Sequence, residues 1–438
     1  MTITYDPKHA KYLDEADVRQ ELTRVYDLCH GCRLCFKFCT SFPTLFEMID
    51  RHDDQDAGRL TPAQQDQVVD ECFQCKLCYI NCPYTPELHE WAIDFPRLML
   101  RTDAMRHATG QVGLRSRFTD TVLGHTDLVG KAATLTAPAT NAVIGAKPGS
   151  LTRKAMQLAT GVSSVRLLPP YARQRFTTWF KRRPKVRIAK RQGRVAVFPT
   201  CLVEYQQPAI GHDLVKVYER NGIECSVTDG VGCCGAPWLH SGDIKQFTKV
   251  AEKNVKALAA SIRRGNDIVV PQPTCGYVLK KDYVDYAPGA DAKLVADHTY
   301  DASEYLMKVH KGEGTSLDID FTGDVPATVT YHTPCHLRAQ NVGLKSRDLI
   351  KLTGAKVTLV QQCSGIDGTW GLRAENTGIS VPIAHKLGDQ INRADGAVVA
   401  GDCHLANTAI TEQTGTRPLH PLQLIARAYG ISEEPPKR

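Results

Sequence analysis

The sequence predicts an α/β protein with a helical N-terminal module that holds two metal clusters, followed by two tandem, duplicated α/β domains. Three observations support this fold class. Two cysteine runs of the same spacing lie in the first hundred residues, strand-like segments alternate with helix-like ones after residue 193, and that order recurs after about 130 residues. Strands that alternate with helices are typical of parallel sheets. We therefore divide the chain into four parts, residues 1–100, 101–194, 195–320 and 321–438.

Composition limits the class of protein. The chain has 438 residues, of which 42% are hydrophobic and 23% are charged, as in a globular protein of several domains. No apolar stretch approaches the roughly 18 residues of a membrane-spanning helix, and the charged N-terminus does not resemble a signal peptide. We therefore expect a cytoplasmic protein. In that reducing compartment, the repeated close spacings among the 16 cysteines point to metal binding rather than to disulfides.

The N-terminal part, residues 1–100, contains two runs with the spacing C-x2-C-x2-C-x3-C, which is typical of bacterial iron–sulfur proteins. Three closely spaced thiolates fit three corners of one cubane, and the fourth, on the following helix, reaches the other cluster. A pair of zinc knuckles would not need this spacing twice. We predict a ferredoxin-like module with two [4Fe-4S] clusters. Cluster 1 is assigned to Cys29, Cys32, Cys35 and Cys82, and cluster 2 to Cys39, Cys72, Cys75 and Cys78.

The second part, residues 101–194, is a basic connector. No acidic residue occurs between Asp127 and Glu204, and Pro169, Pro170 and Pro184 interrupt any long helix. Such a segment can be a solvated linker. It can also bind nucleic acid, which we do not expect because no reading motif accompanies it. Aromatic residues beside basic ones favour an anionic membrane surface or an acidic partner. The predicted membrane or partner contact consists of Arg173, Arg175, Trp179, Phe180, Lys181, Arg182 and Arg183.

The third and fourth parts repeat one order of strands, helices and cysteines. In the first repeat, segments with helix or strand patterns begin at Gly193, Asp213, Ile223 and Asn266, and in the second at Ala327, Asp348 and Gly396. Cysteines follow the strands. Because α/β folds bind ligands at the carboxyl ends of their strands, each repeat is expected to carry a ligand site there.

The two repeats differ in their cysteines. The first supplies Cys201, Cys233, Cys234 and Cys275, and we expect a third iron–sulfur cluster because an adjacent pair such as Cys233 and Cys234 is best explained by a shared metal. The second supplies Cys335, Cys363 and Cys403, with Ser364 in place of the pair's second cysteine. Its metal content stays open between a cluster with His336 or His404 as a fourth ligand, a zinc ion, and a metal-free scaffold.

Two other signals have simpler interpretations. Cys225 aligns with Val357 of the second repeat, which indicates a buried strand residue. The segment GVGCCG, from Gly230, matches a dinucleotide fingerprint, but the cysteine pair already explains it. No set of nucleophile, base and acid stands out, so we predict no catalytic residues. With no flavin or nucleotide motif, the substrate chemistry is expected on a partner chain.

The cysteine pattern of each repeat resembles the CCG domain of heterodisulfide reductases. Two such domains after a two-cluster module resemble the family of the anaerobic glycerol-3-phosphate dehydrogenase iron–sulfur subunit. The likeness includes GHTDLVG from Gly124, FPTCLVEYQQP from Phe198, CCGAP from Cys233, PTCGYVLKKDY from Pro273, and YHTPCH with CSGIDGTWG. It implies an electron-transfer subunit, peripheral at the inner face of the cell membrane, that relays electrons from a partner dehydrogenase towards the quinone pool.

Two alternatives stay open. The same relay could serve a hydrogenase or another metalloenzyme. Alternatively, the chain could be an autonomous heterodisulfide or thiol reductase. Against the reductase, the heterodisulfide reductase pattern ends each domain in CxxC, and here Val278 and Ala406 occupy the last position.

Overall fold

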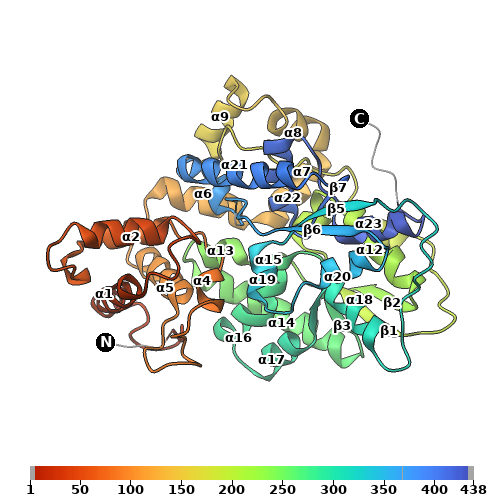
Figure 1. Cartoon of the computed structure of the whole chain (residues 1–438), viewed down its shortest axis with the longest axis horizontal. Coiled ribbons are helices and arrows are strands. Elements are labelled where there is room, and N and C mark those ends of the chain that lie inside the picture. Colours follow the sequence, from red (N-terminus) through yellow and green to blue (C-terminus); the bar gives the residue numbers. More distant parts are fainter. Residues whose placement is uncertain (1–4, 367, 433–438) are drawn as a thin grey trace. The chain divides into compact units, whose positions relative to one another are not determined.

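The computed structural model describes residues 5–366 and 368–432, and it confirms the predicted fold class: a helical N-terminal region precedes two parallel-sheet α/β regions (Figure 1). The chain divides into two compact units, Met1–Asp120 with Pro237–Phe247, and Thr121–Ala236 with Thr248–Arg438. Each is described by itself. The predicted boundary at residue 100 lies within helix α5, Phe95–Ala108. The division into four parts remains a prediction.

The N-terminal unit is helical because capping residues begin its helices and apolar residues line their inner faces. Asp14 caps the first helix, Thr61 and Gln64 form a capping box, and Asp94 caps α5. Its core combines residues such as Leu22, Phe42 and Met99, all fully or almost fully buried. The elements are α1 Glu15–Cys32, α2 Ser41–Asp50, η1 Ala57–Arg59, α3 Pro62–Asp70, α4 Leu77–Ile80, α5, and α6 Leu114–Gly124, which continues into the second unit.

The connector forms short helices, as its prolines and glycines predict. They are α7 Thr126–Leu135, α8 Ala137–Ile144, α9 Leu151–Thr160 and α10 Phe176–Arg182. Two of its arginines are fully buried and hold the connector in place. Arg153 donates hydrogen bonds to the carbonyl oxygens of Ser163 (2.9 Å) and Arg166 (2.7 Å), and Arg166 pairs with Glu412 of α22 at 3.0 Å. Part of the positive charge of this segment is therefore structural.

The first α/β region contains a four-stranded parallel sheet in the order β2-β1-β3-β4. Its strands are β1 Gly193–Val197, β2 Ile223–Val227, β3 Asp267–Val270 and β4 Thr299–Asp301. Its helices are α11 Cys201–Tyr205, α12 Pro208–Arg220, α13 Ala236–His240, α14 Ile244–Arg263, α15 Pro273–Tyr277, the π-helix η2 Val278–Asp282, α16 Tyr283–Tyr286, α17 Ala290–Asp297 and α18 Ala302–Lys311.

The second α/β region contains a three-stranded parallel sheet in the order β6-β5-β7, which repeats the order β2-β1-β3. Alternate residues of β7 face its two sides: Val399 packs with residues of α21 and α22, and Ala400 with residues of α20 and α23. The elements are β5 Thr328–His332, α19 Cys335–Ala339, α20 Lys345–Lys351, β6 Lys356–Val360, η3 Trp370–Leu372, α21 Thr377–Ala394, β7 Val398–Gly401, α22 His404–Thr414 and α23 Pro421–Ala428.

Equivalent helices join the two repeats. Helix α12 contacts α23, and α18 contacts α20. Helix α12 of the first repeat corresponds to α20 of the second, and α18 corresponds to α23. The contact of α12 with α23 is therefore equivalent to the contact of α20 with α18, as in a pair related by a two-fold axis. One hydrophobic core accordingly includes Leu214, Leu306, Leu349 and Ile425, which come from all four helices. The repeats are therefore joined through a shared core.

Candidate metal centres

The eight N-terminal cysteines lie on and beside turns that follow helices α1 and α3. Helix α1 ends at Cys32, and its C-cap residue Arg33 adopts a left-handed conformation (φ 55°) between Cys32 and Cys35. In the second run, Gln74 and Lys76 are left-handed as well (φ 57° and 64°) and separate three cysteines. Because a left-handed residue reverses the chain direction locally, neighbouring thiols can converge on one point.

The structure brings Cys29, Cys32, Cys35 and Cys82 together. Burial raises the pKa of the Cys29 thiol, and the nearby thiols of Cys35, Cys82 and Cys32 raise it further. Burial and the thiols of Cys82 and Cys32 likewise raise the pKa of Cys35 to about 12. Four thiols from two separate runs that converge in a buried place fit the four corners of a cubane.

A second group contains Cys39, Cys72, Cys75 and Cys78. Burial raises the pKa of Cys78, followed by the effects of Cys75, Cys72 and Cys39. The buried ammonium group of Lys76 acts in the opposite direction on the pKa of Cys72. Cys39 also acts on the pKa of Cys35, and Cys35 on that of Cys78, so the assignment of single cysteines to the two clusters stays a prediction.

In the first α/β region, Cys201, Cys233, Cys234 and Cys275 form one group of thiols. Cys201 begins α11 after β1, the adjacent pair follows β2, and Cys275 lies in α15 after β3. Hydrogen bonds from the thiols of Cys201 and Cys234 lower the pKa of Cys233 and raise those of the two donors, and Cys234 also interacts with Cys275. Both members of the adjacent pair therefore face the same site.

Hydrogen bonds between buried side chains and the backbone fix the loop that carries Cys233 and Cys234. The Asn254 side chain donates to the carbonyl oxygen of Cys233 (2.9 Å), and the Tyr283 hydroxyl donates to that of Cys234 (2.9 Å). Asn254 also accepts from the N–H of Gly232 at 3.0 Å. These paired groups hold the backbone on both sides of Cys233 and Cys234.

Asp127, which the sequence analysis did not single out, connects α7 to the same loop. Its carboxylate accepts from the N–H of Cys233 (2.8 Å) and from the hydroxyl of Tyr205 (3.1 Å). Two glycines permit the contact: a Cβ at Gly232 would lie 2.5 Å from Asp127 Oδ2, and one at Gly130 would lie 2.4 Å from the Tyr205 ring. The position of Asp127 inside the GHTDLVG motif is the signal that could have identified it.

In the second α/β region, Cys335, Cys363 and Cys403 follow β5, β6 and β7. The side chain of Gln272, from the first repeat, donates to Cys403 Sγ at 3.2 Å and accepts from the N–H of His404 at 3.2 Å. His336 Nδ1 lies 4.0 Å from Cys335 Sγ. Over residues 5–366 and 368–432, no group of three or more His, Cys, Asp or Glu side chains is arranged to hold a single metal ion.

The aromatic residues of the predicted membrane or partner contact pack against the first α/β region. The Trp179 ring stacks on His212 with centroids 3.9 Å apart, and both Trp179 and Phe180 adjoin the shared core. Arg183 pairs with Glu219 at 2.6 Å and lies over the Phe180 ring. The aromatic rings pack against α12. The exposed residues of the predicted membrane or partner contact are therefore Arg173, Lys181 and Arg182.

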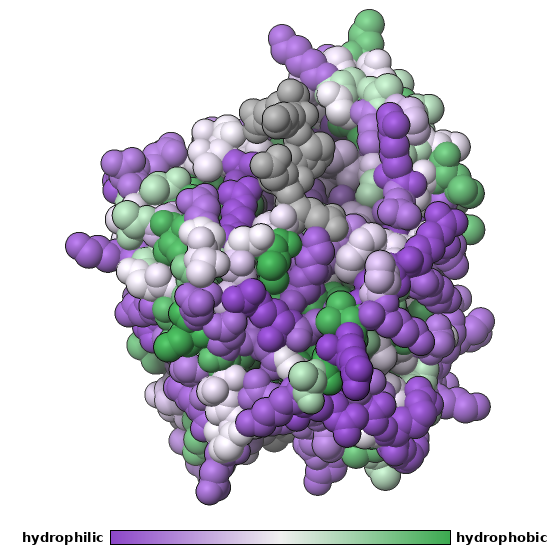
Figure 2. All heavy atoms as spheres, turned by 90° about the vertical axis from the view of Figure 1, so that its right-hand side faces the viewer, coloured by the Kyte–Doolittle hydropathy of each residue, from purple (hydrophilic) through white to green (hydrophobic). Residues whose placement is uncertain are grey.

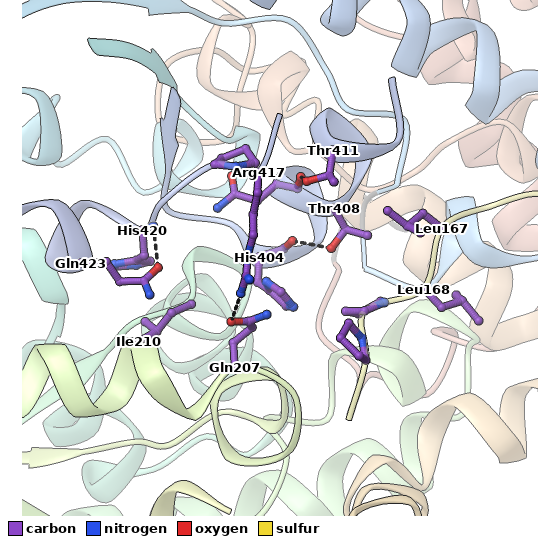
Figure 3. Close-up of a pocket in the computed structure, with 14 residues that line it drawn as sticks. Leu167, Leu168, Gln207, Ile210, His404, Thr408, Thr411, Arg417, His420 and Gln423 are labelled. Carbon is purple, nitrogen blue, oxygen red and sulfur yellow. Dashed lines mark hydrogen bonds between the residues drawn. The ribbon is translucent and has the colours of Figure 1, made fainter. Parts of the chain in front are cut away.

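A cavity of about 200 Å³ lies between residues 167–170, helix α12 and helix α22 (Figure 3). Leucine, isoleucine and proline side chains supply its apolar wall. On the polar side, Arg417 donates to Gln207 at 2.9 Å, and burial lowers the pKa of His404 to about 4 and that of His420 to about 3. His404 Nε2 has no hydrogen-bond partner among the described residues. Neutral imidazoles beside an apolar wall can bind an uncharged molecule that carries carbonyl groups.

Within the described part of the chain, no helix is long and apolar enough to cross a membrane.

Family models match three separate parts of the chain. Residues 21–83 match a 4Fe-4S dicluster domain, which contains all eight N-terminal cysteines and implies two [4Fe-4S] clusters. Residues 195–280 and 329–408 each match a cysteine-rich domain, and these ranges contain the remaining cysteines.

Three named relatives align with 45–70% of this chain. The anaerobic glycerol-3-phosphate dehydrogenase of Escherichia coli strain K12 has a subunit that is 31% identical over 310 residues, which cover 70% of this chain and 76% of the relative. The fumarate reductase (CoM/CoB) of Methanothermobacter marburgensis has a subunit that is 29% identical over 248 residues, 54% of this chain and 46% of that protein. Lactate utilization protein A of Bacillus pumilus is 27% identical over 211 residues, 45% of this chain and 80% of that protein.

Proposed function

This chain belongs to the family of the anaerobic glycerol-3-phosphate dehydrogenase iron–sulfur subunit, in which a 4Fe-4S dicluster domain precedes two cysteine-rich domains, and from that premise we propose that it is the electron-transfer subunit of a dehydrogenase complex. It relays electrons from a partner dehydrogenase towards the membrane quinone pool and works at the inner face of the cell membrane. The observation that carries the proposal is the match of residues 21–83 to a 4Fe-4S dicluster domain, followed by two matches to a cysteine-rich domain.

We assign the ligands of the two N-terminal clusters to the two groups of thiols. Cys29, Cys32, Cys35 and Cys82 hold the first, and Cys39, Cys72, Cys75 and Cys78 hold the second. Burial and the neighbouring thiols raise the pKa values of Cys29 and Cys78, which expresses the cost of holding several thiolates close together. Iron offsets it. When bound, an iron–sulfur cluster supplies a reversible one-electron carrier whose potential depends on burial and hydrogen bonds.

The first cysteine-rich domain holds a third cluster through Cys201, Cys233, Cys234 and Cys275. Its residues have positioning roles: Asn254, Tyr283 and Asp127 fix the backbone on both sides of the adjacent pair, so its two thiols keep one orientation. The second domain has three cysteines, and its metal content is left open. The retained fold and shared core support a structural role for this domain, with Gln272 in contact with Cys403.

The partner is identified by class. The Escherichia coli relative is named as a subunit of a dehydrogenase. This chain carries no nucleotide or flavin motif that the cysteine pattern does not already explain. Substrate oxidation therefore belongs to another chain of the complex. The cavity beside His404 supports a quinone as acceptor, because its apolar wall and neutral imidazoles suit an uncharged, carbonyl-bearing ring. A hydrogenase donor would use the same relay.

The iron content of paired variants tests the third cluster. Cys234→Ser removes a proposed ligand, whereas Cys225→Val changes a cysteine of β2 that pairs with Val195 and adjoins the core. Iron analysis and anaerobic EPR should give about twelve iron atoms per chain for the native protein and for Cys225→Val, and about eight for Cys234→Ser. About eight in the native chain would contradict the third cluster.

An anaerobic affinity purification from native membranes tests the relay itself. Recovery of a flavin dehydrogenase supports the proposal, and recovery of a hydrogenase keeps the relay but changes the donor. A chain without partners that reduces dyes with thiols as electron donors would instead support the autonomous reductase.

A further inference from the structure

Two helices of the connector present the same solvent-exposed pattern. On α7, Leu128, Lys131 and Leu135 are exposed, and on α9 the same holds for Leu151, Lys154 and Leu158. Residues at positions i, i+3 and i+7 lie on one side of a helix. We call these six residues the leucine–lysine face. The exposed fractions of its leucines are 68%, 86%, 85% and 74% in chain order.

Other residues of this segment are apolar or small as well. Val143 on α8 is 41% exposed, and alanines are exposed on all three helices. Figure 2 shows hydrophobic residues between hydrophilic ones at the top of the molecule, the height at which α8 and α9 lie in Figure 1. Exposed leucines that recur at the same spacing on two helices point to a binding surface.

The chemistry of the face favours lipid over protein. Protein interfaces are enriched in aromatic residues and arginine and depleted in lysine. Residues 126–160 contain no aromatic residue, their single arginine, Arg153, is fully buried, and the exposed cations are lysines. Leucines flanking a lysine suit the interface of a bilayer, where the leucines enter the acyl region and the lysine stem reaches up to the phosphates.

Charge complementarity specifies the kind of lipid. No acidic residue occurs from residue 128 to 203, and Asp127 is occupied by the Cys233 N–H and the Tyr205 hydroxyl. An anionic bilayer therefore meets no repulsion from this segment, and each lysine near its surface is attracted to it.

We propose that the leucine–lysine face binds the surface of an anionic lipid bilayer. This deepens the proposed function, on which it rests for its biological meaning, because a protein that delivers electrons to membrane quinone needs a membrane-facing side. It also replaces Trp179 and Phe180, which pack against the protein, as the apolar anchor of the connector.

Co-sedimentation of the reconstituted full chain with vesicles tests this surface. The vesicles contain phosphatidylcholine alone or mixed with phosphatidylglycerol. The native chain should sediment with the anionic vesicles and be released by salt. Leu151→Asp/Leu158→Asp and Leu128→Asp/Leu135→Asp should each weaken binding at least about tenfold. Leu88→Asp, at a leucine that is 70% exposed outside the face, is the matched control and should bind as the native chain does.

A second pair of variants compares the lysines of the leucine–lysine face with the basic residues of α10 as contributors to vesicle binding. Lys131→Glu/Lys154→Glu should weaken binding to anionic vesicles, whereas Lys181→Glu/Arg182→Glu on α10 should change it less than twofold. Iron content shows that each variant has folded and does not depend on lipid.

Three results would overturn the proposal: no vesicle binding by the native chain, undiminished binding by the leucine variants, or, in those variants, loss of a partner dehydrogenase while vesicle binding is kept. The last would make the face a protein interface. The proposed electron relay is judged separately, because clusters and partners are measured without vesicles.

Discussion

Asp127 shows how one residue of the connector supports a cysteine site about a hundred residues further along the chain. Its two oxygens accept from Cys233 and Tyr205, at 2.8 and 3.1 Å. Both donors are largely buried, so each would lose a hydrogen bond that water cannot easily replace. The connector is thus part of the first cysteine-rich site.

Asp127→Ala should lower the free energy of unfolding by about 2 kcal/mol, because it leaves the Cys233 N–H without its acceptor. The same variant should lose iron from the first cysteine-rich site faster than the native protein does, as measured by chelator-induced bleaching under anaerobic conditions. Asp229→Ala is the control, since this carboxylate lies on the same loop with its side chain 92% exposed, and it should change stability by less than about 0.5 kcal/mol. Equal behaviour of the two variants would contradict the role of Asp127.

At this scale, the sequence could predict the cysteines but not most of the residues that position them. Spacing alone indicates that Cys233 and Cys234 share a site, and the duplication indicates that Cys225 is a strand residue. Cys225 does pair with Val195 as Val357 pairs with Val329, at equivalent positions of the two central strands. Asn254, Tyr283 and Gln272 act through contacts between distant segments, for which a single sequence gives no spacing rule.

The residue that caps the N-terminus of helix α23 is His420, a buried histidine with a lowered pKa. His420 is 2% exposed, and its Nδ1 accepts from the N–H of Leu422, in a capping box with Gln423. Burial lowers the pKa of His420 to about 3. An accepting Nδ1 requires an imidazole without a proton on that atom, so the cap exists only with a neutral ring.

The pH dependence of stability should reflect this cap. The pKa of His420 is about 3 in the folded chain and about 6.5 when unfolded, so the unfolded chain binds more protons between those values. Stability is therefore fully present above about pH 6.5 and falls as the pH drops towards 3, by about 2 kcal/mol between pH 7 and 5. His420→Asn should keep the cap and shrink this loss, measured by unfolding midpoints at pH 7 and 5. His9→Asn, at an exposed histidine, should leave it unchanged.

The elements themselves were predicted well where their patterns were strong. The strands β1, β2, β3, β5, β6 and β7 all lie within the segments that the duplication identified. Helix α12 begins at Pro208, five residues before the predicted Asp213, because proline suits the first turn. Strand β4 has three residues, and its counterpart in the second sheet is a single parallel bridge between Leu419 and Ala400 of β7, so neither pattern was long enough to indicate a strand.

The two cysteine-rich domains form one structural body, which a duplication by itself does not predict. Each repeat could bury its helices against its own sheet only, yet α12 contacts α23 and α18 contacts α20. Apolar faces of these amphipathic helices are visible in the sequence, but the identity of their partners is not. The shared core also explains why a domain with three cysteines is retained, since it covers the first domain's helices.

Ile425→Ala therefore should destabilise both domains at once. Ile425 lies on α23 of the second repeat, is 1% exposed and belongs to the core that contains Leu214 and Leu306 of the first. Removing its methylene and methyl groups leaves a cavity, at a cost of about 3 kcal/mol. Hydrogen–deuterium exchange should then accelerate in α12 and α18 as well as in α23. Ile410→Ala, at a fully buried residue that packs within the second domain, should accelerate exchange in α21 and α22 and leave α12 protected. If Ile425→Ala affected the second domain alone, the two domains would be separate folding units, and the second would not be a support for the first.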